Sequence, residues 1–283
     1  MLRDTLRDLK NGDAPKRLAD RLYERGIVYV HVPKCAGSSV ERALRSKYRL
    51  SRKLMDSEAS FSAAAKEFGA IPDDDNRHAI LQKASEMRRN LLHYYLAKGV
   101  KCITGHAPLG TNTIEAYRET YDFVTVLRDP EQRFHSHLAY NLNGGGGHGA
   151  IHEEIDSFLA RPRAVTMGAL YVKYFSGLSM NDDFSTRAAI EASQNALEKM
   201  AVIGFVDAME DFADDLTCLT GSQISIGLHN PTEKSRKQAL QLNDAQKARI
   251  KILVAPDREI YDWARKRFFT AIKSTDSAKQ NAV

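Results

Sequence analysis

The segment 27–42, with the sequence IVYVHVPKCAGSSVER, constrains the fold more than any other part of the chain. It begins with an apolar run, 27–32, that is rich in β-branched side chains and typical of a strand buried on both faces of a parallel sheet. Pro33 ends this run, and Gly37 relaxes the turn that follows. The backbone amides of such a turn converge with the dipole of the next helix into an anion site, to which Lys34 adds positive charge. The segment therefore predicts a phosphate-binding loop between a strand and a helix.

This loop differs from the common loop of proteins that bind nucleoside triphosphates. That motif requires a glycine followed directly by Lys and then Ser or Thr, whereas here Lys34 precedes Gly37 and no Gly-Lys pair follows. Ser38 or Ser39 is expected to cap the helix. Taken alone, the loop has an alternative interpretation, an ordinary strand-to-helix turn with a solvated lysine.

A second strand-to-helix junction follows residues 122–127 (DFVTVL), which form another buried-strand pattern. Asp129 fits the N-cap and Pro130 the first position of a helix, so Arg128 is expected at the carboxyl end of the strand. Ser136 comes nearly two turns later in this helix. Because ligands of open parallel sheets bind at the carboxyl ends of strands, both junctions are expected at one edge of the sheet. Two such anion sites fit a ligand with two separated phosphate groups.

The two junctions resemble known cofactor signatures. Residues 32–39 (VPKCAGSS) and 126–136 (VLRDPEQRFHS) resemble those of sulfotransferases that use 3′-phosphoadenosine 5′-phosphosulfate (PAPS). The match is closer to the carbohydrate branch, which includes the heparan sulfate 2-O-sulfotransferases and their bacterial relatives. Residues 103–110 (ITGHAPLG) resemble the Gly-His segment of that branch, and residues 202–210 (VIGFVDAME) resemble a late strand-and-helix segment.

The resemblance implies an α/β, P-loop-like three-layer fold, with a central, mostly parallel sheet flanked by helices and with helical insertions around the acceptor site. We expect a single domain over 1–283, with its core at 26–220, a helical insertion at 45–98 and a disordered tail at 274–283. The local patterns predict strands at 27–32, 101–104, 122–127 and 202–206, and helices at 56–69, 78–98, 184–200 and 243–270.

The resemblance also implies cofactor contacts. The first loop would hold the 5′-phosphosulfate, and Lys34 would balance the charge on the bridging oxygen as it leaves. Arg128 and Ser136 would bind the 3′-phosphate, a task for which the two-pronged guanidinium of arginine is suited. Cys35 stands where threonine is common, so a hydroxyl contact is lost there. The loop residues expected at the cofactor are Pro33, Lys34, Cys35, Ala36, Gly37, Ser38 and Ser39.

A late polar loop, 230–237, supplies two further cofactor candidates. Related enzymes often close over the nucleotide with a basic loop in this part of the chain. Arg236 and Lys237 are therefore included among the expected cofactor contacts. A glycine run, 144–147, follows the second junction and is interpreted either as a gate for the acceptor or as a solvated linker.

Sulfuryl transfer to an alcohol needs a base, and histidine is the usual recipient of a proton near neutral pH. His106 is the expected base, since it follows the strand predicted at 101–104 and matches the Gly-His position of the family. The alternative is a histidine that caps or packs in a loop. His31 is interpreted as a core residue behind the site. No metal is expected, because the chain contains no His-Glu-x-x-His motif and no cysteine cluster.

The composition fits this interpretation. The 283-residue chain has 43% apolar residues and a net charge of +5. It has no apolar run as long as a membrane helix, so no membrane anchor and no secretory leader are expected, and its three cysteines are expected to be reduced thiols. The chain thus resembles a cytoplasmic bacterial form of the family. A basic stretch, 42–53, would attract an anionic cofactor or an acidic glycan, or is simply solvated; nucleic-acid binding is not expected.

The sequence therefore predicts an enzyme, a PAPS-dependent sulfotransferase that acts on a hydroxyl group of a carbohydrate or glycolipid. Its products would be a sulfate ester and adenosine 3′,5′-bisphosphate. Two alternatives stay open at this point. One is an ATP-dependent phosphotransferase of P-loop-like fold, and the other is a non-catalytic protein that binds a nucleotide as a scaffold.

Overall fold

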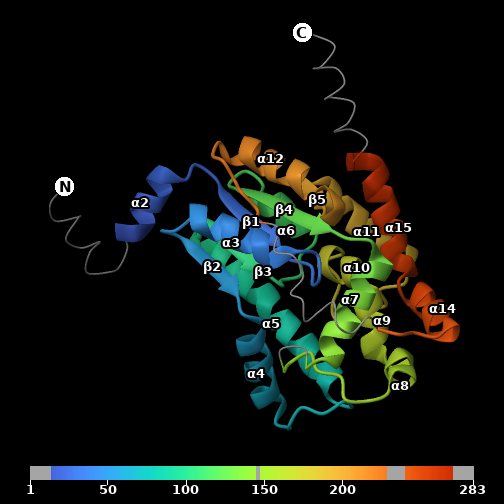
Figure 1. Cartoon of the computed structure of the whole chain (residues 1–283). Helices are drawn as coiled ribbons and strands as arrows, with labels where there is room; N and C mark the ends of the chain where they lie inside the picture. Colours follow the sequence, from blue (N-terminus) through green and yellow to red (C-terminus); the bar gives the residue numbers. More distant parts are fainter. Residues whose placement is uncertain (1–13, 145–146, 228–239, 270–283) are drawn as a thin grey trace, which may run out of the picture.

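The computed structural model describes residues 14–144, 147–227 and 240–269. A five-stranded parallel sheet lies at its centre, with helices on both faces (Figure 1). The predicted α/β fold with three layers is therefore confirmed. The strands, in their order across the sheet, are β2 (Arg52–Met55), β3 (Cys102–Gly105), β1 (Gly26–Val30), β4 (Tyr121–Leu127) and β5 (Val202–Phe205).

The order of the strands creates a crevice at the carboxyl edge of the sheet. The neighbouring strands β1 and β4 pair in parallel, with Ile27 opposite Asp122. From β1 the chain continues through a helix to β2 on one side, whereas from β4 it continues to β5 on the other side. Ligands of open α/β sheets bind where connections diverge in this way. The two loops that resemble cofactor signatures follow these two strands.

The helices vary widely in length and surround the sheet. Those in the first half are α2 (Ala14–Leu22), α3 (Gly37–Lys47), α4 (Ser57–Phe68), α5 (Arg77–Lys98), α6 (Thr111–Tyr117) and α7 (Pro130–Leu142). Those in the second half are α8 (Ile155–Ala160), α9 (Pro162–Gly168), α10 (Leu170–Phe175), α11 (Arg187–Glu198), α12 (Met209–Thr220), α14 (Asp244–Leu253) and α15 (Ala255–Ala264). A 3₁₀ turn, Val206–Ala208, precedes α12, and a π-helical turn, Arg265–Phe269, follows α15.

The predicted helix over 243–270 is wrong in one respect, because α14 and α15 are separate helices that meet at Val254. Proline has no backbone N–H to continue a helix, and Pro256 lies in the first turn of α15. The helices predicted at 56–69, 78–98 and 184–200 are confirmed to within a few residues as α4, α5 and α11.

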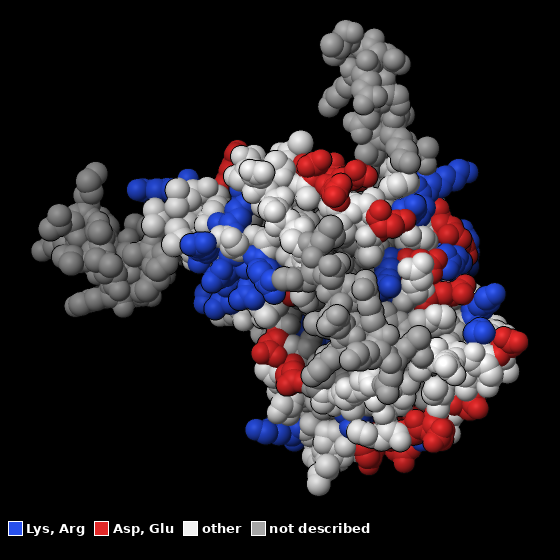
Figure 2. Space-filling model, in the orientation of Figure 1, with Lys and Arg blue, Asp and Glu red and all other residues white. Residues whose placement is uncertain are grey.

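We expected the segment 45–98 to be a helical insertion, and this prediction is wrong in part, because the segment contains the edge strand β2. Three of its four residues are exposed, including Arg52 and Lys53, so the strand lacks the apolar run that marks a buried one. Charged side chains on an edge strand also discourage pairing with another chain. Figure 2 shows Lys and Arg side chains gathered over the end of α3 and β2, where the basic stretch lies.

Two apolar clusters hold the walls of the crevice. The larger surrounds the sheet, and the smaller packs α7 against α8, α9 and α14 through Phe134, Phe158 and Leu253. The second cluster fixes the helix that follows β4 relative to α9, and so shapes one wall. Among the residues described above, no helix has the length and apolar character needed to cross a bilayer. The proposed tail at 274–283 lies outside the described residues.

Candidate functional site

A cavity of about 750 Å³ opens at the carboxyl edge of the sheet, and it is lined by residues of both predicted loops. The cavity brings together nearly all of the residues expected at the site. These are Pro33, Lys34, Ala36, Gly37, Ser38, Ser39, His106, Arg128 and Ser136. Cys35 is not among the lining residues, and Arg236 and Lys237 lie outside the described residues.

The turn after β1 has an unusual backbone. Lys34 and Ala36 both have positive φ, 66° and 57°. These values lie in the left-handed region that residues other than glycine rarely adopt. Ala36, and neither Ser38 nor Ser39, is the N-cap of α3, and no side chain caps the helix. The predicted serine cap is therefore wrong, because the helix begins one residue before the serines. Their position in the first turn leaves them lining the cavity.

Gly37 has a different function from the one expected of it. It does not have positive φ, and it is already the first residue of α3. A Cβ atom at this position would lie 1.9 Å from Nε2 of His31, which real atoms cannot do. The glycine is therefore required by the close approach of the imidazole to the loop, and the turn itself is made by its two neighbours with positive φ.

Lys34 and Arg128 lie side by side, although they come from two loops far apart in the sequence. Nη1 of Arg128 donates to the carbonyl oxygen of Lys34 at 3.2 Å. Nζ of Lys34 lies 4.3 Å from the ring centre of Tyr140 on α7. Burial, and the positive charge of Arg128, lower the pKa of Lys34. The buried Nε of Arg128 has no hydrogen-bond partner among the residues that the structure describes, so the pair has donors available for an anion.

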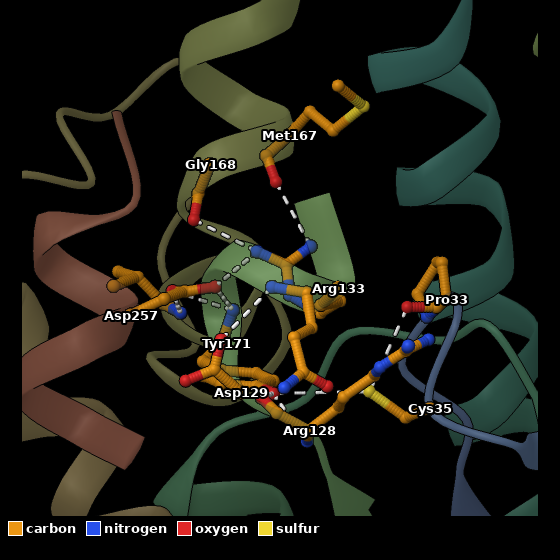
Figure 3. A network of polar contacts seen from close by, with 11 residues as sticks. Pro33, Cys35, Arg128, Asp129, Arg133, Met167, Gly168, Tyr171 and Asp257 are labelled. Carbon is orange, nitrogen blue, oxygen red and sulfur yellow. Dashed lines mark hydrogen bonds and ion pairs between the residues drawn. The ribbon is translucent and has the colours of Figure 1, made fainter. Parts of the chain in front are cut away.

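Tyr171 on α10 fixes the backbone of Arg128 (Figure 3). Its hydroxyl accepts from the N–H of Arg128 at 2.8 Å and donates to the carbonyl oxygen of the same residue. Burial raises the pKa of Tyr171 well above its usual value, so the hydroxyl keeps its proton and can donate. The backbone N–H of Tyr171 in turn donates to the carboxylate of Asp257 at 2.9 Å. Arg128 is thus held through α10 by a residue of α15.

Arg133 does not face the cavity, although it precedes Ser136 by one helical turn. Its side chain is fully buried and forms an ion pair with Asp257 at 2.9 Å. The guanidinium also donates to the carbonyl oxygens of Met167 and Gly168, at 3.1 and 3.0 Å. Burial raises the pKa of Asp257 to about 6, which still leaves the carboxyl ionised at neutral pH. Arg133 is therefore a structural residue that joins α7 to α9 and α15.

Cys35 lies beneath the loop and away from the cavity. Its side chain is fully buried, with Sγ 3.8 Å from the carbonyl oxygen of Pro33 and 4.0 Å from the hydroxyl of Tyr171. Its backbone N–H donates to the carbonyl oxygen of Val32 within the turn, at 3.3 Å. Burial raises the pKa of the thiol to about 11, so it is uncharged at neutral pH. Neither its side chain nor its amide is available to a ligand.

His106 follows β3 directly, and its ring is held in one tautomer. Nδ1 lies 2.5 Å from the carbonyl oxygen of His31. Only a protonated nitrogen can donate to a carbonyl, so Nδ1 carries the hydrogen and Nε2 has a free lone pair. Burial, and then the neighbouring imidazole of His31, lower the pKa of His106 well below its usual value. The ring is therefore neutral at pH 7 and can accept a proton through Nε2.

The cavity is also lined by four histidines that were not predicted at the site, among them His31 and His137. The ring of His31 lies 4.2 Å from that of His106, and its Nδ1 is 3.1 Å from Oε1 of Glu41. The buried Nδ1 of His137 has no hydrogen-bond partner within the described part of the chain. Burial, and then nearby cations led by Arg133, lower the pKa of His137 well below its usual value. Periodicity could not show which side of α7 would face the cavity.

The ionisable groups of the described lining are nearly all basic. Its lysines and arginines are Lys34, Arg88, Arg128, Arg163 and Lys173, its histidines are His31, His78, His106, His137 and His148, and the lining residues that the structure describes include no Asp or Glu. Three of these cations, which lie on helices α5, α9 and α10, were not predicted at the site. The only local signal was a single lysine, Lys173, in the apolar segment Leu170–Phe175. Within the described ranges, no cluster of side chains suited to a metal ion is present.

Comparisons with known proteins add little to this description. No family model matches the chain, and no curated protein matches it. A solved structure from work on the PezAT chromosomal toxin–antitoxin system of the human pathogen Streptococcus pneumoniae is 11% identical, with a TM-score of 0.35. The match covers 87% of this chain and 97% of that chain. A likeness this weak carries no argument, so the function must be argued from the cavity itself.

Proposed function

We propose that the protein is a PAPS-dependent sulfotransferase that acts on a hydroxyl group of a carbohydrate. The observation that carries the proposal is the contact between Lys34 and Arg128, the cations of the two loops that resemble the cofactor signatures. The loops follow the adjacent strands β1 and β4 and line one cavity together with His106. An anion with two phosphate groups would find Lys34 and the hydroxyls of two serines at the first loop, and Arg128 and the hydroxyl of Ser136 on α7 at the second.

The residues present fit such a cofactor. The buried Nε of Arg128 has no partner in the described chain, and neither Lys34 nor Arg128 contacts a carboxylate there. Ser38, Ser39 and the amides at the start of α3 would hold the 5′-phosphosulfate with Lys34, whereas Arg128 and Ser136 would hold the 3′-phosphate. When bound, PAPS supplies an activated sulfuryl group, whose bond to the 5′-phosphate breaks as the acceptor oxygen bonds to sulfur.

The chain supplies proton transfer and charge stabilisation. Nε2 of His106 would take the proton from the acceptor hydroxyl, a task that requires a neutral imidazole. Lys34 would stabilise the negative charge that develops on the departing phosphate oxygen, since cations fixed in advance stabilise such charge without reorganisation.

The test is calorimetric titration with adenosine 3′,5′-bisphosphate and with ADP. We expect tighter binding of the bisphosphate, and a loss of about 10- to 100-fold in Arg128→Ala, because a charge-assisted hydrogen bond contributes about 1.5–3 kcal/mol. Arg118→Ala, which removes an exposed arginine, is the matched control and should bind like the wild type. Turnover would then be measured as transfer of labelled sulfate from PAPS to a panel of sugars.

Equal or tighter binding of ADP would overturn the proposal and favour the ATP-dependent phosphotransferase. If the folded protein prefers the bisphosphate but transfers no sulfate to any acceptor in the panel, the result would favour the non-catalytic scaffold. A preference that persists in Arg128→Ala would contradict the assignment of that residue to the 3′-phosphate.

A further inference from the structure

Three buried cations line the cavity beyond the two loops. Arg88 on α5, Arg163 on α9 and Lys173 on α10 are only 7–8% exposed. Burying a charge is costly unless an opposite charge or a full set of hydrogen bonds accompanies it. The partners of these three side chains therefore decide whether the cluster is structural or is built for a ligand.

The two arginines are held by neutral groups. Nε of Arg88 donates to the carbonyl oxygen of His106 at 2.7 Å, and Nη1 donates to the hydroxyl of Ser60 at 2.6 Å. Arg163 donates to the carbonyl oxygen of Ala150 at 2.9 Å and to that of Gly149. These bonds fix both guanidinium groups without neutralising their charge.

Lys173 is the exception, because its amino group has no hydrogen bond or ion pair within the described parts of the chain. Burial, and then the positive charges of Arg88 and Arg89, lower its pKa to about 7. A lysine in the apolar segment Leu170–Phe175 has no structural need for its amino group. Its ammonium group is therefore free to bind something that enters the cavity.

The members of the cluster lie close enough to affect one another. His78, which also lines the cavity, has its pKa lowered to about 4, first by burial and then by the charges of Lys173 and Arg163. More distant carboxylates, Asp74 and Glu153, act weakly on Arg163 but form no ion pair with it. Within the described residues, no carboxylate forms an ion pair with any of these three cations, whereas a doubly charged oxyanion would neutralise most of their charge.

We propose that Lys173, Arg163 and Arg88 form a second anion site, which binds a phosphate or sulfate ester group carried by the acceptor. Arg88 links this site to the base, since its guanidinium donates a hydrogen bond to the backbone carbonyl oxygen of His106. A hydroxyl beside the bound group would then be held near Nε2 of that residue. The proposal deepens the proposed function and rests on it for the identity of the second ligand: the acceptor is a phosphorylated or sulfated hydroxyl compound.

The test requires that the site formed by the two loops be filled with nucleotide before any other anion is added. Protein loaded with adenosine 3′,5′-bisphosphate is titrated with inorganic phosphate, inorganic sulfate and acetate, and the titrations are repeated with Lys173→Met. We expect one phosphate or sulfate to bind to the loaded wild type, at least tenfold weaker binding to the variant, and weaker binding of acetate to both. Lys66→Met, on the exposed surface of α4, is the matched control and should bind like the wild type.

A second measurement separates direct binding from a structural effect. An anion beside Lys173 would raise its pKa from about 7, so binding at pH 8 should take up a proton. Calorimetry in buffers of different ionisation heat measures this uptake, which should be absent in Lys173→Met. The variant should remain folded, because replacing a buried charge by an apolar side chain of similar length does not reduce packing.

The outcomes keep the two proposals apart. If the bisphosphate binds but phosphate and sulfate do not, or if acetate binds as tightly as either, the second site is overturned and the cofactor assignment stands. If the bisphosphate does not bind, the proposed function fails, and the anion titrations are run on Arg128→Ala to disable the loop site. Binding of phosphate that still depends on Lys173 there supports the second site by itself, and binding that does not depend on it overturns that site.

Discussion

The hydroxyl of Tyr171 offers a sharp test of how the second loop is held. Tyr171→Phe removes one oxygen that makes two hydrogen bonds with the backbone of Arg128, one as acceptor at 2.8 Å and one as donor. Each such bond contributes about 0.5–1.5 kcal/mol to stability, so the variant should lose roughly 1–3 kcal/mol in the free energy of unfolding. The ring remains, and with it the packing in the core.

The same change should alter ligand preference. Without the hydroxyl, the backbone of Arg128 is no longer fixed at the end of β4, and its guanidinium loses its position at the 3′-phosphate. A loss of about 1.4 kcal/mol in the binding free energy of the 3′-phosphate would reduce the preference for adenosine 3′,5′-bisphosphate over ADP about tenfold. Calorimetric titration of both nucleotides gives this ratio directly, and urea denaturation gives the change in stability.

Tyr121→Phe is the matched control. Its hydroxyl is also buried and donates to the carbonyl oxygen of Leu96 at 3.3 Å, but Tyr121 begins β4 and so lies at the opposite end of the strand from Arg128. It should lose stability without a change in nucleotide preference. If Tyr171→Phe were destabilised as expected but kept the full preference for the bisphosphate, the argument that this tyrosine positions Arg128 would be refuted.

Three other perturbations test the remaining parts of the site. Arg133→Met leaves the buried carboxylate of Asp257 without its cation, so it should cost about 3–5 kcal/mol in urea denaturation, whereas Arg187→Met, at an exposed ion pair, should cost less than about 1 kcal/mol; equal losses would contradict the structural role of the buried pair. The pKa of Lys173 falls from 10.5 in the unfolded chain to about 7 in the folded protein, so the unfolded chain binds more protons between these values. The free energy of unfolding of the wild type, relative to Lys173→Met, should therefore rise with pH across that range, and a flat difference would count against the burial of a charged lysine. His106→Gln should lower the turnover number by about 10²–10⁴ and leave nucleotide affinity unchanged. Because burial holds the pKa of His106 well below its usual value in the free enzyme, the wild-type kcat/KM, which reports the free enzyme, should be maintained as the pH falls to 6.5, and a decline of kcat/KM centred above neutral pH would point to another base.

The sequence was sufficient for the strands and loops that build the crevice. Strands β1 and β4 are covered on both faces by helices, so they appear as continuous apolar runs, and the prolines after them mark the turns. Strand β2 was missed for the converse reason. It is an edge strand with exposed Arg52 and Lys53, and its pairing with β3 depends on residues about fifty positions later. No local pattern records such a partner.

Side-chain direction was the harder part of the site to predict. Cys35 and Gly37 occupy the same loop, yet one points into the core and the other makes room for His31. The left-handed conformations of Lys34 and Ala36 determine these directions, and neither residue type signals such a conformation. Loop membership could therefore be predicted from the sequence, whereas access to a ligand could not.

The arrangement of charge explains why His106 is a suitable base. The chain carries a net charge of only +5, and Figure 2 shows acidic and basic side chains distributed over the face that it draws, so the excess of cations in the cavity is a local feature. Burial contributes most to the lowered pKa of His106, and His31 and Arg88 lower it further. Anions bound in the two loops and at Lys173 would offset part of this positive potential and raise that pKa toward the range in which an imidazole accepts a proton most effectively. The bound anions, which these cations hold near His106, would thus make it a stronger base when both ligands are present, which is when a proton must be removed from the acceptor.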